Sequence, residues 1–260
     1  MIANFFQSLN SGGVEYLLIS GQATVLYGAA TFSEDIDLWI NPTESNRERF
    51  LASLKGCGAR YYKLTPRLTT TSLHRGHGFH FVLGNEQNPV FLDIMGNPPR
   101  VGDFASANEQ AQWMQTEWGD VRTVGIKTLV ELKKTQRLED YPIISKLALA
   151  WFDQPECTAN EIEFSWAVQN IFTLPELATF FHEHPQAVNA PRIHDALAVF
   201  GRQLLRDGDT TETTDNDTRE ILQSRIAFLQ SADRNYWRDI IAELKALRAA
   251  GLLMQEGNPV

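Results

Sequence analysis

Two aspartates inside an apolar segment constrain the fold of this chain more than any other sequence feature. Asp35 and Asp37 stand one residue apart in DIDLWI, which ends in Leu38, Trp39 and Ile40. Alternate side chains of a strand point to opposite faces, so the two carboxylates share one face of the predicted strand. Neighbouring carboxylates repel each other, and at least one pKa rises unless a positive partner is present. We therefore expect a divalent cation at this position.

A glycine turn comes shortly before the aspartates. Residues 14–20, VEYLLIS, predict a buried strand, and residues 21–30, GQATVLYGAA, predict a helix that follows without a linker. Ser20 and Gly21 therefore stand at a sharp strand-to-helix turn. Free backbone N–H groups at such a turn favour phosphate, and glycine allows the phosphate to approach the chain closely.

A third acid follows in a predicted hairpin. The segments HGFHFVLG and VFLDIMG are separated by the turn-forming residues GNEQNP, which is typical of two antiparallel strands. Asp93 lies between Leu92 and Ile94 on the second of these strands. Its carboxylate could bind a second metal ion and accept the proton of an attacking hydroxyl group.

This order of motifs resembles the DNA polymerase beta-type nucleotidyltransferase superfamily, in particular its small bacterial members related to the AbiEii toxins and the minimal nucleotidyltransferases. SGQA, DID and FLDIM occupy the places of the glycine turn, the paired acids and the third acid, and LVELKKTQRLEDYPII is similar to a later Lys, Arg and Asp segment. The resemblance implies an α+β fold. A nucleotidyltransferase-fold mixed β-sheet with flanking helices would form a catalytic domain over residues 1–150, followed by a helical C-terminal domain over residues 151–260.

The same resemblance implies a Mg²⁺-dependent nucleotidyltransferase that moves a nucleoside monophosphate from an NTP to a hydroxyl group. Asp35, Asp37 and Asp93 would be the catalytic residues and would hold two Mg²⁺ ions. The implied nucleotide-binding residues are Ser20, Gly21, Ser33, Lys133 and Lys134.

Two departures from the family pattern keep a second hypothesis open. Thr31 stands where relatives usually carry an arginine, and Gln22 replaces the second small residue of the turn. The second hypothesis is therefore a catalytically inactive binding module with the nucleotidyltransferase fold, acting as an antitoxin or a sensor.

The acceptor and the partners also remain open. The resemblance implies an RNA end such as that of tRNA, in a toxin–antitoxin or phage-defence system with a cognate toxin or antitoxin, or a hydroxyl group of a protein. A small molecule such as an aminoglycoside is a third option. The net charge of −9 disfavours broad nucleic-acid binding but leaves room for a local basic patch. No basic start followed by a long apolar run is present, so we expect a cytoplasmic protein without a membrane partner.

Three further expectations concern side chains and loops. The histidines His74, His77 and His80 are expected in a loop and a strand near the hairpin, with ordinary hydrogen bonds. Residues 207–217, rich in Gly, Asp and Thr, predict a solvent loop. The tryptophans expected in the core are Trp113, Trp118, Trp151, Trp166 and Trp237.

Overall fold

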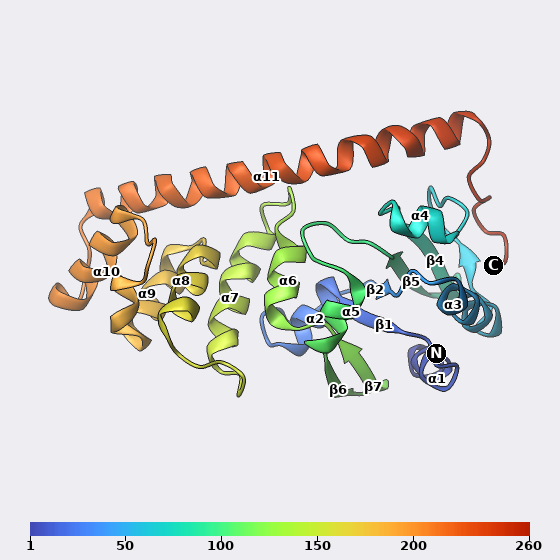
Figure 1. Cartoon of the computed structure of the whole chain (residues 1–260), viewed down its shortest axis with the longest axis horizontal. Coiled ribbons are helices and arrows are strands. Elements are labelled where there is room, and N and C mark those ends of the chain that lie inside the picture. Colours follow the sequence, from blue (N-terminus) through green and yellow to red (C-terminus); the bar gives the residue numbers. More distant parts are fainter. The chain divides into compact units, whose positions relative to one another are not determined.

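The computed structural model describes residues 1–260, and the chain divides into two compact units (Figure 1). The first unit comprises Met1–Leu26, Ala30–Leu132 and Asn235–Val260. The second unit comprises Tyr27–Ala29 and Lys133–Arg234. The long helix α11, Glu212–Ala249, contributes residues to both units, so the units do not follow the linear order of the chain. The predicted domain boundary at residue 150 stays a prediction.

A seven-stranded mixed sheet forms the centre of the first unit, in the order β3-β4-β5-β2-β1-β7-β6. The pairs β2 with β5 and β1 with β7 are parallel, and the other neighbouring pairs are antiparallel. The predicted hairpin around Asp93 is present as β4 and β5, whereas the hairpin of β6 and β7 was not predicted. The strands are β1 (Tyr16–Ile19), β2 (Ile36–Ile40), β3 (Arg60–Tyr61), β4 (Phe79–Asn85), β5 (Asn88–Met95), β6 (Gln112–Thr116) and β7 (Gly119–Thr123).

Helices flank this sheet and bury its apolar residues. All four residues of β1 are buried, which is expected of a strand in the interior of a sheet covered on both faces. α1 buries Phe5, Phe6 and Leu9 and packs against α3 and β7, while α2 packs against β1 and β2. The helices are α1 (Ile2–Ser11), α2 (Ser20–Leu26), α3 (Glu44–Gly56), α4 (Thr70–His74), α5 (Phe104–Glu109) and α6 (Ile126–Lys133).

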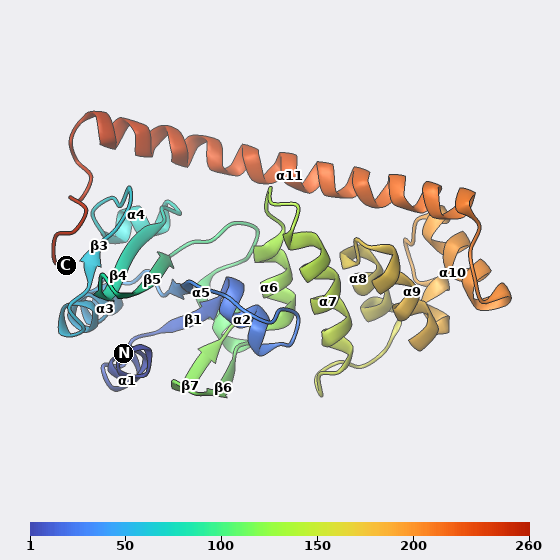
Figure 2. The ribbon, with the colours of Figure 1, turned by 180° about the vertical axis from the view of Figure 1, so that it is seen from behind.

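The second unit is helical and has its own aromatic core. Phe164, Phe180, Phe181 and Phe200 are all buried within one apolar cluster. Its elements are α7 (Asp140–Phe152), α8 (Glu161–Asn170), α9 (Leu174–Glu183), the 3₁₀ helix η1 (Pro185–Asn189), α10 (Asp195–Asp207) and the first part of α11, seen from behind in Figure 2. The predicted fold class, a mixed sheet with flanking helices followed by a helical region, is confirmed.

The loop predicted at residues 207–217 is wrong in its second half, because α11 begins at Glu212. The backbone N–H of Thr214 donates to the Thr211 hydroxyl at 3.3 Å, as expected of a residue that caps a helix. Glu212 and Asp215 lie in the first turn, where the helix dipole favours negative charge. Asp and Thr are typical of both loops and helix starts, so the composition of this segment was ambiguous.

The C-terminal tail returns to the sheet at its β3 edge. The Tyr61 backbone N–H donates to the Asn258 carbonyl at 2.9 Å, and the Val260 N–H donates to the Ala59 carbonyl at 3.0 Å. These bonds fix the end of the chain to the first unit. None of the helices combines the length and the apolar character that crossing a membrane requires.

Candidate active site

The sheet register places two of the predicted catalytic acids beside each other. Asp37 on β2 is the direct partner of Asp93 on β5, and neighbouring parallel strands lie about 4.8 Å apart. Paired residues of adjacent strands project to the same face of the sheet. Asp35 comes just before β2, two residues ahead of Asp37. Asp37 and Asp93 thus lie side by side on β2 and β5, and Asp35 lies just before β2.

Electrostatics link Asp35 to this pair. Burial raises the pKa of the Asp35 carboxyl above its ordinary value, and the nearby Asp93 carboxylate raises it further. Lys63 and, to a smaller extent, His80 act in the opposite direction but do not cancel the rise. The folded chain therefore holds like charges near each other at a cost in free energy, which a bound cation would remove.

His80 completes this group from the neighbouring strand. It is the register partner of Asp93 on β4, and its Nδ1 lies 2.8 Å from Asp93 Oδ1. An ionised carboxylate can only accept, so Nδ1 carries the proton and donates it. This hydrogen bond fixes one oxygen of Asp93.

The predicted phosphate turn is closely packed against the loop before β2. Ser20 has a φ of +57°, a left-handed conformation that is uncommon for a residue with a side chain. A Cβ atom on Gly21 would lie only 2.1 Å from Ser33 Oγ, so this position requires glycine. The Gln22 side-chain amide donates to the Ser33 carbonyl at 2.7 Å. The structure thus brings Ser20, Gly21 and Ser33 together, and Gln22, a departure from the family pattern, anchors this loop.

Sequence reasoning missed Lys63, an exposed cation whose charge acts on Asp35. Lys63 has a φ of +53°, and its Nζ lies 4.9 Å from the centre of the Tyr62 ring. The buried Thr65 hydroxyl donates to the Tyr62 carbonyl at 2.7 Å and accepts from the His80 N–H at 3.1 Å, which ties the loop of Lys63 to β4. A sequence signal was available, because residues 49–85 contain six Lys and Arg residues and no Asp or Glu.

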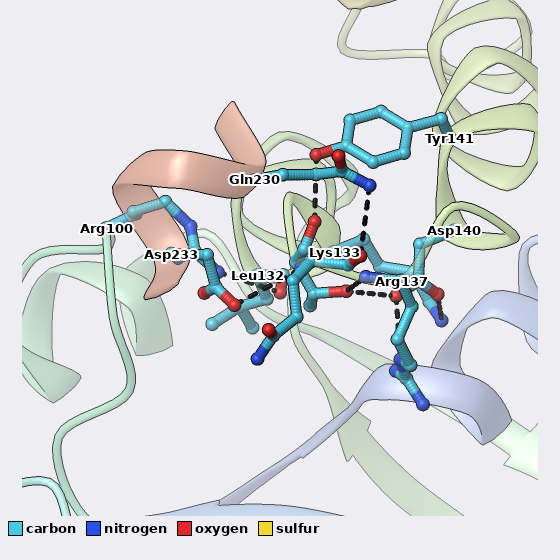
Figure 3. Close-up of polar contacts among 10 residues, drawn as sticks. Arg100, Leu132, Lys133, Arg137, Asp140, Tyr141, Gln230 and Asp233 are labelled. Carbon is cyan, nitrogen blue, oxygen red and sulfur yellow. Dashed lines mark hydrogen bonds and ion pairs between the residues drawn. The ribbon is translucent and has the colours of Figure 1, made fainter. Parts of the chain in front are cut away.

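Lys133 and Lys134 belong to the second unit, and Lys133 is held in an internal ion cluster (Figure 3). Lys133 is only 6% exposed, and its Nζ donates to Asp140 Oδ1 at 2.9 Å. Thr135 Oγ1 and Arg137 Nε donate to Asp140 Oδ2 at 2.6 and 3.1 Å. Contact of either lysine with a triphosphate stays a prediction.

Two side chains of α11 extend the same network. Asp233 Oδ2 accepts from the Gln136 backbone N–H at 3.2 Å, and the Gln230 amide donates to the Gln136 carbonyl at 3.0 Å. Figure 3 shows both side chains directed at this segment from α11. The segment that follows α6 is therefore fixed by polar contacts on both its side-chain and its backbone groups.

A cavity of about 250 Å³ opens beside the acids in the first unit. Asp37, Asp93 and His80 line it together with Trp237 of α11.

Trp237 is half-buried and lines a cavity, so its predicted place in the core is wrong. Trp113 is also outside the core: it is 58% exposed on the edge strand β6, with the Arg122 guanidinium over its ring.

The chemistry of the acids fits magnesium, although no group of three or more His, Cys, Asp or Glu side chains is arranged to hold a metal ion by itself. Mg²⁺ prefers oxygen ligands and is usually bound by one or two carboxylates together with substrate phosphates. Asp35 and Asp37 supply such oxygens. The fit is therefore to a metal ion that binds together with a nucleotide.

Comparisons with known proteins add little to this geometry. No protein-family model matches the chain, and no curated protein is significantly similar to it. The crystal structure of ANT(2'')-Ia in complex with adenylyl-2''-tobramycin is similar to this chain with a TM-score of 0.35 and 12% sequence identity, over 78% of this chain and 96% of that chain. A similarity at this TM-score supports no conclusion about function.

Proposed function

We propose that this chain is a Mg²⁺-dependent nucleotidyltransferase that transfers a nucleoside monophosphate from an NTP to a hydroxyl group at the end of an RNA. One observation carries the proposal: Asp37 and Asp93 are direct neighbours on β2 and β5, and burial together with the Asp93 charge raises the pKa of Asp35. Carboxylates held together against their own repulsion at one place in a fold are typical of a functional site.

In the proposed reaction, Asp93 accepts the proton of the acceptor hydroxyl. The hydroxyl oxygen then forms a bond to the α-phosphorus, the bond from that phosphorus to the bridging oxygen breaks, and pyrophosphate leaves. His80 holds one oxygen of Asp93 by its 2.8 Å hydrogen bond and leaves the other oxygen for the proton. Two Mg²⁺ ions, held by Asp35, Asp37 and Asp93, would supply stabilisation of the negative charge on the phosphate oxygens.

The basic segment 49–85 favours RNA as the acceptor. It carries six cations and no acid in a chain whose net charge is −9. Lys63, Arg67 and Arg75 are exposed within it, and Lys63 is close enough to Asp35 to affect its pKa. Phosphate contacts by Lys and Arg supply most of the affinity of proteins for nucleic acids. A tRNA end, and a role as a toxin or phage-defence component with a cognate partner, belong to the same proposal.

Transfer of label from each of the four α-³²P-labelled NTPs to total cell RNA or to cell protein tests the proposal. Wild type with Mg²⁺ should label RNA with at least one NTP. Asp35→Asn and Asp37→Asn should each lower the rate by about 10²-fold or more, since each removes charge stabilisation at the phosphates. Asp120→Asn, an exposed acid on β7, is the matched control and should keep the wild-type rate.

Two outcomes would contradict the proposal in different ways. Label in protein instead of RNA would show that the acceptor is a protein, and the proposed enzyme activity would still hold. No label with any NTP, together with a rise in melting temperature when an NTP and Mg²⁺ are added, would contradict the enzyme hypothesis and support the inactive binding module.

Lys63 offers a second test of the RNA acceptor. Lys63→Ala should raise the KM for RNA and lower the slope of log affinity against log salt by about 1, as expected for one lost phosphate contact. Lys146→Ala, an exposed lysine on α7, should change neither quantity. An unchanged salt slope in Lys63→Ala would exclude Lys63 from the RNA contact.

A further inference from the structure

One wall of the cavity beside Asp93 comes from a part of the chain to which the proposed reaction gives no role. Trp237, Ile240, Ile241 and Leu244 of α11 line it, together with residues of the sheet that include Asp37, His80 and Asp93. The spacing of these residues, three or four apart, places them on one face of the helix. The α11 side of the cavity is therefore apolar, and the sheet side mixes apolar residues with the polar side chains of Asp37, His80 and Asp93.

The apolar wall is held firmly against the loop before β4. Gly76 has a φ of +81°, and a Cβ atom there would lie 2.7 Å from Tyr236 Oη and 3.4 Å from Ile240 Cδ1. Tyr236 Oη also donates to the Asn97 carbonyl at 3.3 Å, and Arg75 forms an ion pair with Glu243. Close packing and polar contacts on both sides of Trp237 thus fix this part of α11 within the first unit.

A buried imidazole nitrogen in the same cavity has no hydrogen bond. His77 lines the cavity and is only 1% exposed, and its Nε2 has no hydrogen-bond partner. Glu243 Oε2 lies 3.2 Å from Nε2 but without the geometry of a hydrogen bond. Buried polar atoms are nearly always hydrogen-bonded, and Nε2, whose contact with Glu243 lacks that geometry, has a hydrogen bond left to make with a ligand.

The size of the cavity suits a single ring system. Its volume of about 250 Å³ exceeds the roughly 150 Å³ that accommodates a benzene ring and is smaller than the roughly 300 Å³ at which pockets for drug-sized ligands begin. An aromatic and aliphatic wall favours a flat apolar face, and the hydrogen bond that His77 Nε2 does not make within the chain favours a polar atom at the ring edge. A nucleobase has both features, and bases at RNA ends are commonly stacked on aromatic side chains.

We propose that this cavity binds the terminal base of the acceptor, with Trp237 as the stacking surface and His77 Nε2 as the group that pairs with the base edge. The inference rests on the proposed function, because it assigns the side of the site at which the acceptor enters. It makes Trp237 and His77 specificity-determining residues, and the ribose of the bound nucleotide then lies at Asp93, the residue that accepts the hydroxyl proton.

Binding without catalysis gives the first test. The four ribonucleosides are titrated into the full chain without NTP or Mg²⁺, and binding is followed by saturation-transfer NMR and calorimetry. At least one nucleoside should bind to wild type, and Trp237→Ala should weaken it about tenfold, as expected for a lost stacking contact. Trp113→Ala is the matched control, since Trp113 is exposed on β6 and does not line the cavity. Trp237→Phe, which keeps an aromatic face, should retain most of the binding.

Three results of this titration would overturn the base site. They are no binding of any nucleoside to wild type, equal losses in Trp237→Ala and Trp113→Ala, and full displacement of the nucleoside by an NTP with Mg²⁺. The last result would assign the cavity to the base of the nucleotide donor. Melting temperatures of all variants separate lost binding from lost folding.

Transfer to defined RNA separates this inference from the proposed function. A six-nucleotide RNA and the same RNA with an abasic 3′-terminal ribose serve as acceptors. Trp237→Ala should raise the KM for the ordinary RNA about tenfold and leave that for the abasic RNA unchanged. Equal transfer to both RNAs by wild type would contradict the base site but would still support the proposed transferase activity. No transfer to either RNA, with nucleoside binding that still depends on Trp237, would contradict the proposed transferase activity but would still support a nucleobase site.

Discussion

The two units each contain a group of close charged side chains, but the charges are arranged in opposite ways. In the second unit the Asp140 carboxylate is 2% exposed and accepts from Lys133, Thr135 and Arg137. In the first unit the neighbours of Asp35 include a second carboxylate, that of Asp93, and the pKa of Asp35 is raised. Buried charges persist in folded proteins when they are paired and hydrogen-bonded. The comparison indicates that the cluster around Asp140 serves the fold, whereas the acids of β2 and β5 repel each other, as expected if they bind the metal ions of the proposed reaction.

The largest effect is expected when the paired cluster loses its buried cation. Lys133→Met should lower the free energy of unfolding by about 3–5 kcal/mol, because it leaves the buried Asp140 carboxylate without its buried positive partner. Urea denaturation followed by circular dichroism measures this change.

A double variant tests whether the loss comes from the unpaired charge. Lys133→Met combined with Asp140→Leu should recover most of the lost stability, since replacing both members of a buried ion pair by apolar residues is often nearly neutral. Arg137→Gln should cost less than about 1 kcal/mol, because that side chain is 57% exposed. A loss in Lys133→Met below 1 kcal/mol would mean that the cluster is not essential to the fold.

A smaller effect is expected at the packed turn of the first unit. Gly21→Ala should cost about 1–3 kcal/mol, because the added methyl group overlaps Ser33 Oγ. Gly21→Ala with Ser33→Gly should recover stability, since the second change removes both Ser33 atoms that the methyl group would meet. Thermal unfolding of the two variants measures the difference. If the double variant is no more stable than Gly21→Ala, contact with Ser33 is not what makes glycine necessary.

The sequence contained enough information to predict that the acids meet, because strand alternation and hairpin pairing are local rules. Asp37 and Asp93 lie on strands that were predicted from their apolar residues, and the register places them side by side. The same local rules could not reveal that Lys133 is buried. A Lys, an Arg and an Asp close together in sequence are equally compatible with a solvated helix face and with an internal cluster.

The parts of the site that depend on long-range packing were also beyond sequence reasoning. Trp237 reaches the cavity because α11 packs against the loop around Gly76, and no local pattern indicates which surface a long helix covers. The hairpin of β6 and β7 was missed because β6 is an edge strand, with the exposed Trp113 in place of a buried apolar residue. Lys63 was visible only as part of an acid-free segment, and its effect on Asp35 follows from the fold.

Removing a charge from the acids should affect stability very little, in contrast to the paired cluster. Asp35→Asn should leave the free energy of unfolding at pH 7 equal to or slightly above that of wild type, within about 0.5 kcal/mol, because it removes a repelling carboxylate. Urea denaturation in the absence of metal ions measures this. A loss of more than 1 kcal/mol would show that Asp35 contributes to the fold as Asp140 does, and the contrast between the two units would disappear.

The smallest expected effect is a change in the titration of Asp35 itself, followed by carboxyl ¹³C NMR. Its pKa is raised above the ordinary value of 3.8 by burial and by Asp93 and lowered by Lys63, so Asp93→Asn should lower it and Lys63→Ala should raise it. The folded state then binds the Asp35 proton more tightly than the unfolded state does. The contribution of this group to stability therefore falls as pH rises from 3.8 through the raised value, and Asp93→Asn should narrow that pH range. An Asp35 pKa that stays the same in Asp93→Asn would mean that the two carboxylates are too far apart to interact, and they could not then share a metal ion.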